Sequence, residues 1–421
     1  MVPAKKKLLI VTFDSPYPAV HGGSISIFGS VNYLRSFFDI TLVFRVFTRK
    51  QIQDAEELKK IWKNVAIKYI SYYPLSSFSL RIRNLAYVLF KKVKQIGKRL
   101  DKNPELQKII SNPVIAPLDG AFISHLEKIF SENKFDIIQV EHSCLINIIH
   151  ILPKDSIRIF VQIEGQFLML NDLFFINKDE SLYARYLKEH TRFSEDSLIS
   201  QYDYIFALNQ SDAANIRKIC NKDNVFVTPF PIPDSLTVNT NIGEWVPDKL
   251  LFMGHQTHYP NMDAVEWFIE KIYVSAYRQS GLKLYITGYW KKRFIRKYKN
   301  VKFTGFVDDL SAIMKNSLVI CPIRIGGGGL RAKVIHAMSM GCPVIATKGC
   351  CEGMEGLVDG MNILFADNEP EFIFAIKKLT EDKKLRNLII KNGKDLIVRN
   401  YSEKTTGEIR RNIYCEILKK G

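Results

Sequence analysis

The sequence predicts an α/β protein made of two domains, each built on a doubly wound parallel sheet. A chain of 421 residues exceeds what one ordinary hydrophobic core accommodates and indicates two domains of roughly 200 residues. Short, continuously apolar runs alternate with helical patterns, as expected for strands buried in parallel sheets. Loops rich in glycine follow apolar strands in both halves, and ligands of such sheets bind beyond the carboxyl ends of the strands.

The first half opens with a strand, a turn and a helix. Residues 8–13 form a continuous apolar run, and residues 14–23 contain two prolines and two glycines. Residues 24–37 then show helical spacing of apolar side chains, and residues 40–44 form a second apolar run. This alternation predicts a parallel sheet with helices packed on it.

The same alternation continues to a break near the middle of the chain. Further strands of the first half are expected at 136–140, 157–162, 204–208 and 225–228. A proline-rich turn at 230–234 leads into a polar stretch at 239–247, which is typical of a linker. Strands resume at 249–254, 282–288, 301–305 and 318–323. We therefore expect domains at 1–240 and 241–400.

The charge of the chain favours an acidic partner. Its formal net charge is +17 and its pI is about 9.4, which suits phosphates, nucleic acid or an anionic membrane. Residues 79–102 read as a basic amphipathic helix, either lying on an anionic membrane surface or exposing its basic side to water. No recognition motif of a nucleic-acid-binding class is present, so we expect no nucleic acid.

The lengths of the apolar runs and the spacing of the cysteines indicate where the protein is expected to be located. No run approaches the ~18 apolar residues that span a bilayer, and the run at 8–13 is too short for a signal peptide. The seven cysteines have no metal-like spacing and read as reduced thiols. We expect a cytoplasmic protein, with peripheral binding to the inner face of the plasma membrane if the basic helix docks there.

A glycine run carries the strongest chemical signal. Residues 326–329 are four glycines that follow the strand at 318–323 and precede a helix at 330–340. Glycine lets the backbone approach a ligand closely, and a helix N-terminus attracts anions. Arg331 and Lys333 add positive charge at that point, so a diphosphate is the simplest ligand.

Other chemistries lack their motifs. The chain contains no Asp-x-Asp pattern and no His/Cys cluster, so no metal site is predicted. It also lacks the Gly-x-Ser-x-Gly and Walker patterns, and the glycine run does not have the dinucleotide-binding spacing.

Several motifs of the second half resemble the nucleotide-sugar-binding domain of glycosyltransferase family 4, the retaining group with the GT-B fold. The matching pieces are the strand at 251–254, the segments 260–268 and 305–310, and above all 321–356. In the first half, Gly22-Gly23 and the strand at 135–138 are similar in placement. The resemblance implies two Rossmann-like domains facing across a cleft, with residues 401–421 as a helix that crosses back to the first domain.

The resemblance also implies an activity. Family members transfer a sugar from a UDP- or GDP-linked donor with retention of configuration, without a metal or any other cofactor. Arg331 and Lys333 would then neutralise the leaving diphosphate. Glu141 aligns with the family's catalytic histidine, and His142 is the next residue. Either residue would orient the acceptor or stabilise charge on the sugar.

The donor site implied by the resemblance includes residues of both halves. Its members are Gly22, Gly23, Arg324, Gly327, Gly328, Gly329, Leu330, Arg331, Lys333, His336 and Glu352. Gly328 and His336 stand where the family commonly has two glutamates, the second of which binds ribose. A neutral imidazole at His336 can accept the same hydrogen bonds, more weakly than a carboxylate.

The sequence thus predicts a hexosyl-type glycosyltransferase that acts on a glycan, lipid-linked or protein acceptor in surface polysaccharide or glycoconjugate synthesis. The alternative is a catalytically inactive protein of the same fold that binds sugar nucleotides or serves as a scaffold. The missing glutamates motivate that alternative.

Overall fold

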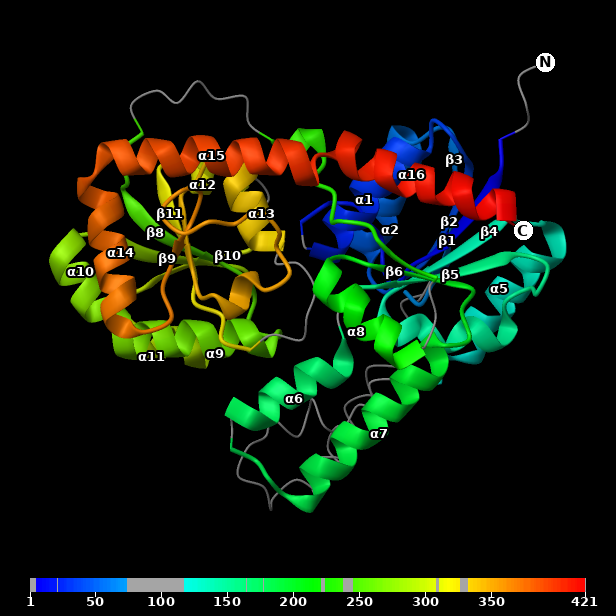
Figure 1. The fold of residues 1–421 in the computed structure, drawn as a ribbon, viewed down its shortest axis with the longest axis horizontal. Helices are drawn as coiled ribbons and strands as arrows, with labels where there is room; N and C mark the ends of the chain where they lie inside the picture. Colours follow the sequence, from blue (N-terminus) through cyan, green and yellow to red (C-terminus); the bar gives the residue numbers. More distant parts are fainter. Residues whose placement is uncertain are drawn as a thin grey trace.

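The computed structural model describes residues 5–20, 22–73, 117–163, 165–176, 178–220, 224–237, 245–307, 310–325 and 332–420. Within these residues the chain folds into two α/β domains that lie side by side (Figure 1). The basic helix expected at 79–102 and the glycine run with Arg331 lie outside the described residues.

The first domain contains a seven-stranded parallel sheet. Its strand order is β3-β2-β1-β4-β5-β6-β7. The strands are β1 (Lys7–Val11), β2 (Asp39–Val46), β3 (Val65–Ser71), β4 (Ile137–Glu141), β5 (Ile157–Gln162), β6 (Tyr204–Ala207) and β7 (Val225–Val227). In the register, Leu8 pairs with both Ile40 of β2 and Ile137 of β4. The direction of winding therefore reverses between β1 and β4, which places a ligand crevice at their carboxyl ends.

The second domain repeats this plan with six parallel strands. The order is β10-β9-β8-β11-β12-β13. The strands are β8 (Lys249–Met253), β9 (Lys283–Thr287), β10 (Lys302–Gly305), β11 (Ser317–Cys321), β12 (Val344–Ala346) and β13 (Leu364–Phe365). Here the winding reverses between β8 and β11. The predicted fold class, two Rossmann-like doubly wound domains, is confirmed.

Helices cover both faces of each sheet. In the first domain they are α1 (Gly22–Leu34), α2 (Arg49–Ile61), α5 (Gly120–Glu132) and α8 (Gln210–Cys220), whereas α6 (Gln166–Ile176) and α7 (Leu182–Ile199) project away from the sheet (Figure 1). The second domain has α9 (Tyr259–Trp267), η3 (Phe268–Tyr273), α10 (Val274–Ser280), α11 (Lys292–Lys297), α12 (Leu310–Met314), α13 (Ala332–Ser339), α14 (Glu369–Glu381) and α15 (Lys383–Tyr401). A last helix, α16 (Glu403–Lys420), and three short 3₁₀ turns, η1 (Ser143–Ile151), η2 (Asp234–Leu236) and η4 (Gly349–Cys351), complete the described elements.

Local sequence explains where several helices begin. Thr48 caps α2 through a reciprocal arrangement in which its hydroxyl accepts from the amide of Gln51 while the Gln51 side chain accepts from the amide of Thr48. Asp119 and Asn368 cap α5 and α14 in the simpler one-way manner. No helix in the part of the chain that the structure describes is both long and apolar enough to cross a bilayer.

The two connections between the domains run side by side. The amide of Ile232, on the way from β7 to the second domain, donates to the carbonyl of Tyr401 at 2.7 Å. Ile232 also bridges to Ser402 in a parallel β arrangement, just before α16 begins. After this crossing, α16 lies along the first domain, while α15 stays on the second (Figure 1).

Polar and close-packed contacts fix α16 on the first domain. Arg410 is buried and donates to the hydroxyls of Ser30 on α1 and Thr228 after β7, each at 3.0 Å. Tyr414 donates to the side chain of Gln139 on β4. Gly407 faces Tyr33 so closely that a Cβ built on it would lie 2.3 Å from that ring.

The Gly407→Ala variant is therefore expected to loosen the crossing helix. The added methyl group has no room beside Tyr33, and overpacking of this kind costs about 1–3 kcal/mol of unfolding free energy. Chemical denaturation of both variants checks this. Gly120→Ala is the matched control, because a Cβ at this helical glycine meets no atom within 4 Å. Equal stability of the two variants would contradict the packing described.

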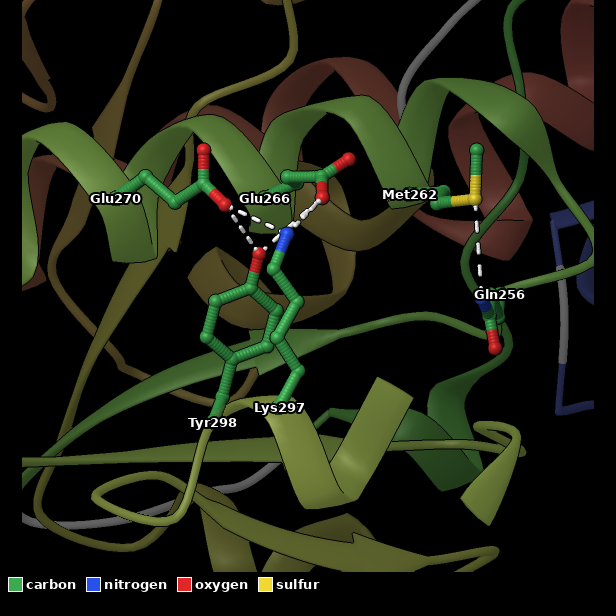
Figure 2. A network of polar contacts seen from close by, with 6 residues as sticks. All are labelled: Gln256, Met262, Glu266, Glu270, Lys297 and Tyr298. Carbon is green, nitrogen blue, oxygen red and sulfur yellow. Dashed lines mark hydrogen bonds and ion pairs between the residues drawn. The ribbon is translucent and has the colours of Figure 1, made fainter. Parts of the chain in front are cut away.

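In the second domain, an ion-pair cluster secures α11 against α9 and η3. Lys297 contacts the carboxylates of Glu266 and Glu270 at 2.7 Å each, and the hydroxyl of Tyr298 donates to Glu270 at 2.7 Å (Figure 2). Gln256, at the carboxyl end of β8, lies at the other end of α9 and accepts from the amide of Lys291 at 2.8 Å. These contacts hold the loop between β8 and α9.

Candidate functional site

The two domains meet where the carboxyl ends of their central strands face each other. Gly22, the first residue of α1, touches the first residue of α13: a Cβ built on Gly22 would lie 3.0 Å from the Cβ of Ala332. Two helix N-termini thus converge from opposite domains. Each presents free backbone N–H groups and the positive end of its dipole, so their meeting point suits an anion.

A second contact closes the same edge. Gly353, in the loop after β12, has a φ of +83° and lies so close to Asn209 that an added Cβ would be 2.5 Å from its amide nitrogen. The side chain of Asn209 in turn accepts from the amide of Asp212 at the start of α8. Glu352 is exposed beside this contact. The predicted residues Gly22, Gly23 and Glu352 therefore all lie on elements at the domain boundary.

Lys333 is oriented by a buried amide. Its ammonium group donates to the Oδ1 atom of Asn261 at 2.6 Å and lies 4.7 Å from the centre of the Phe252 ring. Asn261 is buried, and its Nδ2 atom donates to the carbonyl of His255 at 3.1 Å. The loop after β8 thereby fixes a positive charge in the first turn of α13.

Glycines let the loops beneath Lys333 pack tightly. Gly288 has a φ of +91°, and a Cβ there would lie 2.5 Å from the carbonyl oxygen of Gly254. A Cβ on Gly254 itself would lie 2.6 Å from the side chain of Asn261. The indole nitrogen of Trp290 donates to the Gly254 carbonyl at 3.0 Å. Only glycine satisfies such close approaches together with the positive φ of Gly288.

Arg324, a predicted phosphate ligand, pairs with a carboxylate of the second domain. Its guanidinium forms two hydrogen bonds to Asp263 on α9, at 2.6 and 3.1 Å, and stacks 4.9 Å from the centre of the Trp267 ring. A bidentate carboxylate already neutralises this charge. Arg324 therefore braces α9 against the loop after β11, and its role as a phosphate ligand stays a prediction.

His336 lies one helical turn after Lys333, on the same side of α13. Its side chain is buried, and burial lowers its pKa to about 4. The imidazole is therefore neutral near pH 7, the form in which one ring nitrogen can accept a hydrogen bond.

This burial predicts a pH-dependent contribution to stability. The folded-state pKa of His336, about 4, lies below the ordinary value of 6.5, so the unfolded chain takes up a proton more readily. The stabilising effect is present above pH 6.5 and is lost as the pH falls towards 4. Between these limits the wild type should lose about 3 kcal/mol more than His336→Gln. Denaturation midpoints across this range test it, and parallel curves for the two proteins would contradict it.

Glu141, a predicted site residue, is buried beside α16. It is the last residue of β4, only 2% exposed, and its carboxylate accepts from Gln139 at 2.5 Å and lies 3.9 Å from Arg410. Burial raises its pKa to about 6, although Arg410 opposes this shift. Because side chains alternate along a strand, Glu141 points into the contact with α16, and its role in orienting an acceptor stays a prediction.

His142, the next residue, lies at the carboxyl edge of the first sheet. Its φ of 75° and ψ of 134° are rare for a residue with a side chain, and it opens the 3₁₀ turn η1. Such backbone conformations cluster at functional sites. His142 is therefore the first-domain residue that best fits the predicted catalytic position.

The sequence did not single out every residue that builds this edge. Asn209, which contacts Gly353 across the boundary, carries no local pattern that marks it. Asn261 lies in the matched segment 260–268, but its contact with Lys333 could not be predicted from that match. Gly327, Gly328, Gly329, Leu330 and Arg331 are predicted ligands outside the described residues. In the part of the chain that the structure covers, no three His, Cys, Asp or Glu side chains gather as a metal site would require.

Comparison with known proteins agrees with this geometry. Residues 247–382 match the family model described as glycosyl transferases group 1. Over 184 residues, the chain is 32% identical to the uncharacterized glycosyltransferase MJ1069 of Methanocaldococcus jannaschii, covering 40% of this chain and 45% of that protein. It is also 20% identical to an uncharacterized 44.6 kDa protein in the cps region of Klebsiella pneumoniae, covering 94% and 97% of the two chains.

Two solved structures share the whole arrangement. Sucrose-phosphate synthase from Thermosynechococcus elongatus is 11% identical, with a TM-score of 0.68 over 99% of this chain and 100% of its own. Anabaena Alr3699/HepE, solved in complex with UDP and glucose, is 12% identical, with a TM-score of 0.63 over 97% and 99%. At these identities the likeness concerns the fold.

Proposed function

We propose that the chain, which has the GT-B fold and whose residues 247–382 match glycosyl transferases group 1, is a glycosyltransferase that moves a sugar from a UDP-linked donor to a glycan acceptor. The donor nucleotide binds mainly to the second domain, and the acceptor enters from the first. The UDP-containing complex of the Anabaena protein supports UDP over GDP.

One observation carries this proposal: the N-termini of α1 and α13 meet at Gly22 and Ala332, with Lys333 in the same helical turn. A diphosphate bound there accepts hydrogen bonds from free backbone amides of two helices and pairs with an ammonium group. Arg331, two residues before Lys333 in the sequence, is proposed to supply a second positive charge. The full charges and the helix dipoles stabilise the leaving diphosphate as the glycosidic bond breaks.

These positive groups also support transfer without a metal or any other cofactor. Lys333, Arg331 and the helix N-termini would neutralise the negative charge of the diphosphate, as a divalent cation would otherwise do. We further propose that the configuration at the anomeric carbon is retained, with acceptor and leaving phosphate on one face of the sugar. The leaving phosphate then takes the acceptor proton, and His142 is proposed to orient the acceptor hydroxyl.

His336 completes the proposed donor site. A neutral imidazole accepts a hydrogen bond from a ribose hydroxyl, and its lowered pKa of about 4 keeps it neutral across the physiological range. His336 stands where the family commonly has a glutamate, and a neutral imidazole is a weaker hydrogen-bond acceptor than a carboxylate. We therefore expect a moderate affinity for the nucleotide.

The acceptor that fits best is a growing surface polysaccharide. The Klebsiella relative, which matches nearly the whole chain, is described by its location in a cps region. A lipid-linked precursor of such a polymer would lie at the inner face of the plasma membrane. Residues 79–102 are proposed to bring the enzyme to that surface, because their basic side complements anionic lipids.

A ligand screen followed by product analysis tests the proposal. Thermal shifts with UDP, GDP and their sugars should identify the nucleotide, since a ligand that binds only the folded state raises its stability. NMR of the product then gives the anomeric configuration. Binding of UDP without release of sugar, with water or any glycan as acceptor, would reduce the protein to a binding scaffold.

A further inference from the structure

Three aromatic rings lie together where the first three strands of the first domain end. Phe13 follows β1, Phe47 follows β2 and Tyr72 follows β3. The register pairs Val46 with Ser71, which sets Phe47 beside Tyr72 one residue further on. The centres of the Phe13 and Phe47 rings are 6.4 Å apart, and the Phe47 and Tyr72 rings stack with centres 5.1 Å apart. We call these three side chains the aromatic platform.

A buried cation holds the platform in place. Arg45, near the end of β2, is 8% exposed, and its guanidinium carbon lies 4.4 Å from the centre of the Phe13 ring and 5.8 Å from that of Phe47. The guanidinium also lies 3.8 Å from one carboxylate oxygen of Asp119, whose other oxygen accepts from the Tyr72 hydroxyl at 2.6 Å. Cation–π contacts are favourable where the cation is shielded from water. The orientation of the three rings is therefore set before any ligand binds.

Packing within the domain does not cover the platform completely. Phe13 and Phe47 are large apolar side chains, yet they remain 36% and 38% exposed. Both follow parallel strands at their carboxyl ends, where α/β sheets bind their ligands. Ligand sites are lined mainly by apolar and aromatic side chains, with a few polar groups among them. The platform therefore has the composition and the position of a binding surface.

The platform also lies beside the boundary of the two domains. Lys50, in the first turn of α2, lies 5.5 Å from the centre of the ring of Phe306, which follows β10 in the second domain. Phe47 precedes this contact by three residues. Phe13 and His142 follow neighbouring strands of the first sheet, β1 and β4. A ligand on the platform would thus be close to the proposed site of transfer.

The charges at the platform favour an uncharged ligand. Arg45 contacts the rings, but Asp119 contacts Tyr72 and Asp14 directly follows Phe13, so two carboxylates accompany one cation. An anionic phosphate gains nothing from such a set of charges. A hexopyranose is neutral, with C–H groups on one face of its ring and hydroxyls around the edge. The C–H face suits the partial negative charge on the face of an aromatic ring, and carboxylates accept hydrogen bonds from the hydroxyls.

We propose that the aromatic platform binds a hexopyranose unit of the acceptor, with the apolar face of the sugar ring against Phe13 and Phe47. This binding selects a glycan that ends in an uncharged sugar, in preference to a protein side chain or a lipid phosphate. The inference rests on the proposed function, because it specifies the acceptor of that reaction.

Saturation-transfer NMR on the UDP-saturated protein tests the platform directly. The probes are the methyl pyranosides of glucose, galactose, mannose and N-acetylglucosamine. Saturation should reach the ring protons of at least one of them. Phe13→Leu combined with Phe47→Leu should weaken its binding at least about tenfold, because two aromatic contacts are lost. Leucine keeps an apolar side chain and removes only the aromatic face.

Phe37→Leu is the matched control for this double variant. Phe37 is also 36% exposed, and its ring lies 4.1 Å from the guanidinium carbon of Arg411, much as Phe13 lies against Arg45. It stands between α1 and β2, however, at the amino ends of the strands. The control should bind the sugar as the wild type does. Thermal unfolding of both variants establishes that they are folded.

Steady-state kinetics provide a second readout that separates acceptor from donor. The double variant should raise the KM for the acceptor about tenfold, and it should leave kcat and the KM for the UDP-sugar within twofold of wild type. No thermal shift with UDP would count against the proposed function itself. Binding of UDP without saturation of any glycoside overturns the inference about the platform, and so does sugar binding that the double variant retains in full.

Discussion

Replacing Lys333 with methionine is expected to lower kcat/KM for sugar transfer by about 10²–10³-fold. Removing a single preorganised group that stabilises developing negative charge typically has an effect of this size. Methionine retains much of the aliphatic contact with the Phe252 ring, so the loss falls mainly on the charge. Steady-state kinetics with the donor found by the screen measure the change.

Two comparisons separate this effect from a loss of structure. Lys297→Met removes another lysine of the same domain, one held by Glu266 and Glu270 away from the domain boundary, and should leave kcat/KM unchanged. Thermal unfolding of Lys333→Met should show a modest decrease, since Asn261 loses its partner. Activity within threefold of wild type would remove Lys333 from the proposed chemistry.

Gly22→Val is expected to reduce activity by about 10²-fold through geometry alone. The Cβ of any residue at this position lies 3.0 Å from the Cβ of Ala332, so the branched side chain pushes the starts of α1 and α13 apart. Displacements of about 1 Å between reacting groups can cost this much in rate. The same kinetic assay reports it, together with a weaker affinity for UDP.

Gly120→Val is the matched control for this wedge. Gly120 is also the first residue of a helix, α5, and nothing lies within 4 Å of a Cβ built there. Both variants lose the same glycine freedom, but only Gly22→Val alters the contact between the domains. Full activity of Gly22→Val would show that the two helix ends need not meet during the reaction.

Much of the fold follows from local patterns in the sequence. The continuous apolar runs at 8–13 and 249–254 correspond to β1 and β8, because a strand covered by helices on both faces has no polar side to alternate. Lys333 became a candidate ligand for a similar reason: a positive charge just after a glycine run and a strand is a local signal. These features do not depend on residues distant in the sequence.

Contacts between residues far apart in the sequence could not be predicted from such local patterns. Glu141 has the local context of a site residue, yet Arg410, far along the chain, pairs with it inside the domain. Arg324 is similarly taken up by Asp263. Neither partner can be identified from spacing, because each contact arises only when separate elements pack. The same holds for Asn261, because its role depends on its contact with Lys333.

The most direct test of the central claim is an experimental structure of this chain with UDP bound. We expect both phosphates at the junction of α1 and α13, with an oxygen within hydrogen-bonding distance of the Lys333 ammonium and the N-terminal amides of α13. We also expect the ribose beside His336. Phosphates bound elsewhere, or a nucleotide that leaves Lys333 paired only with Asn261, would contradict it.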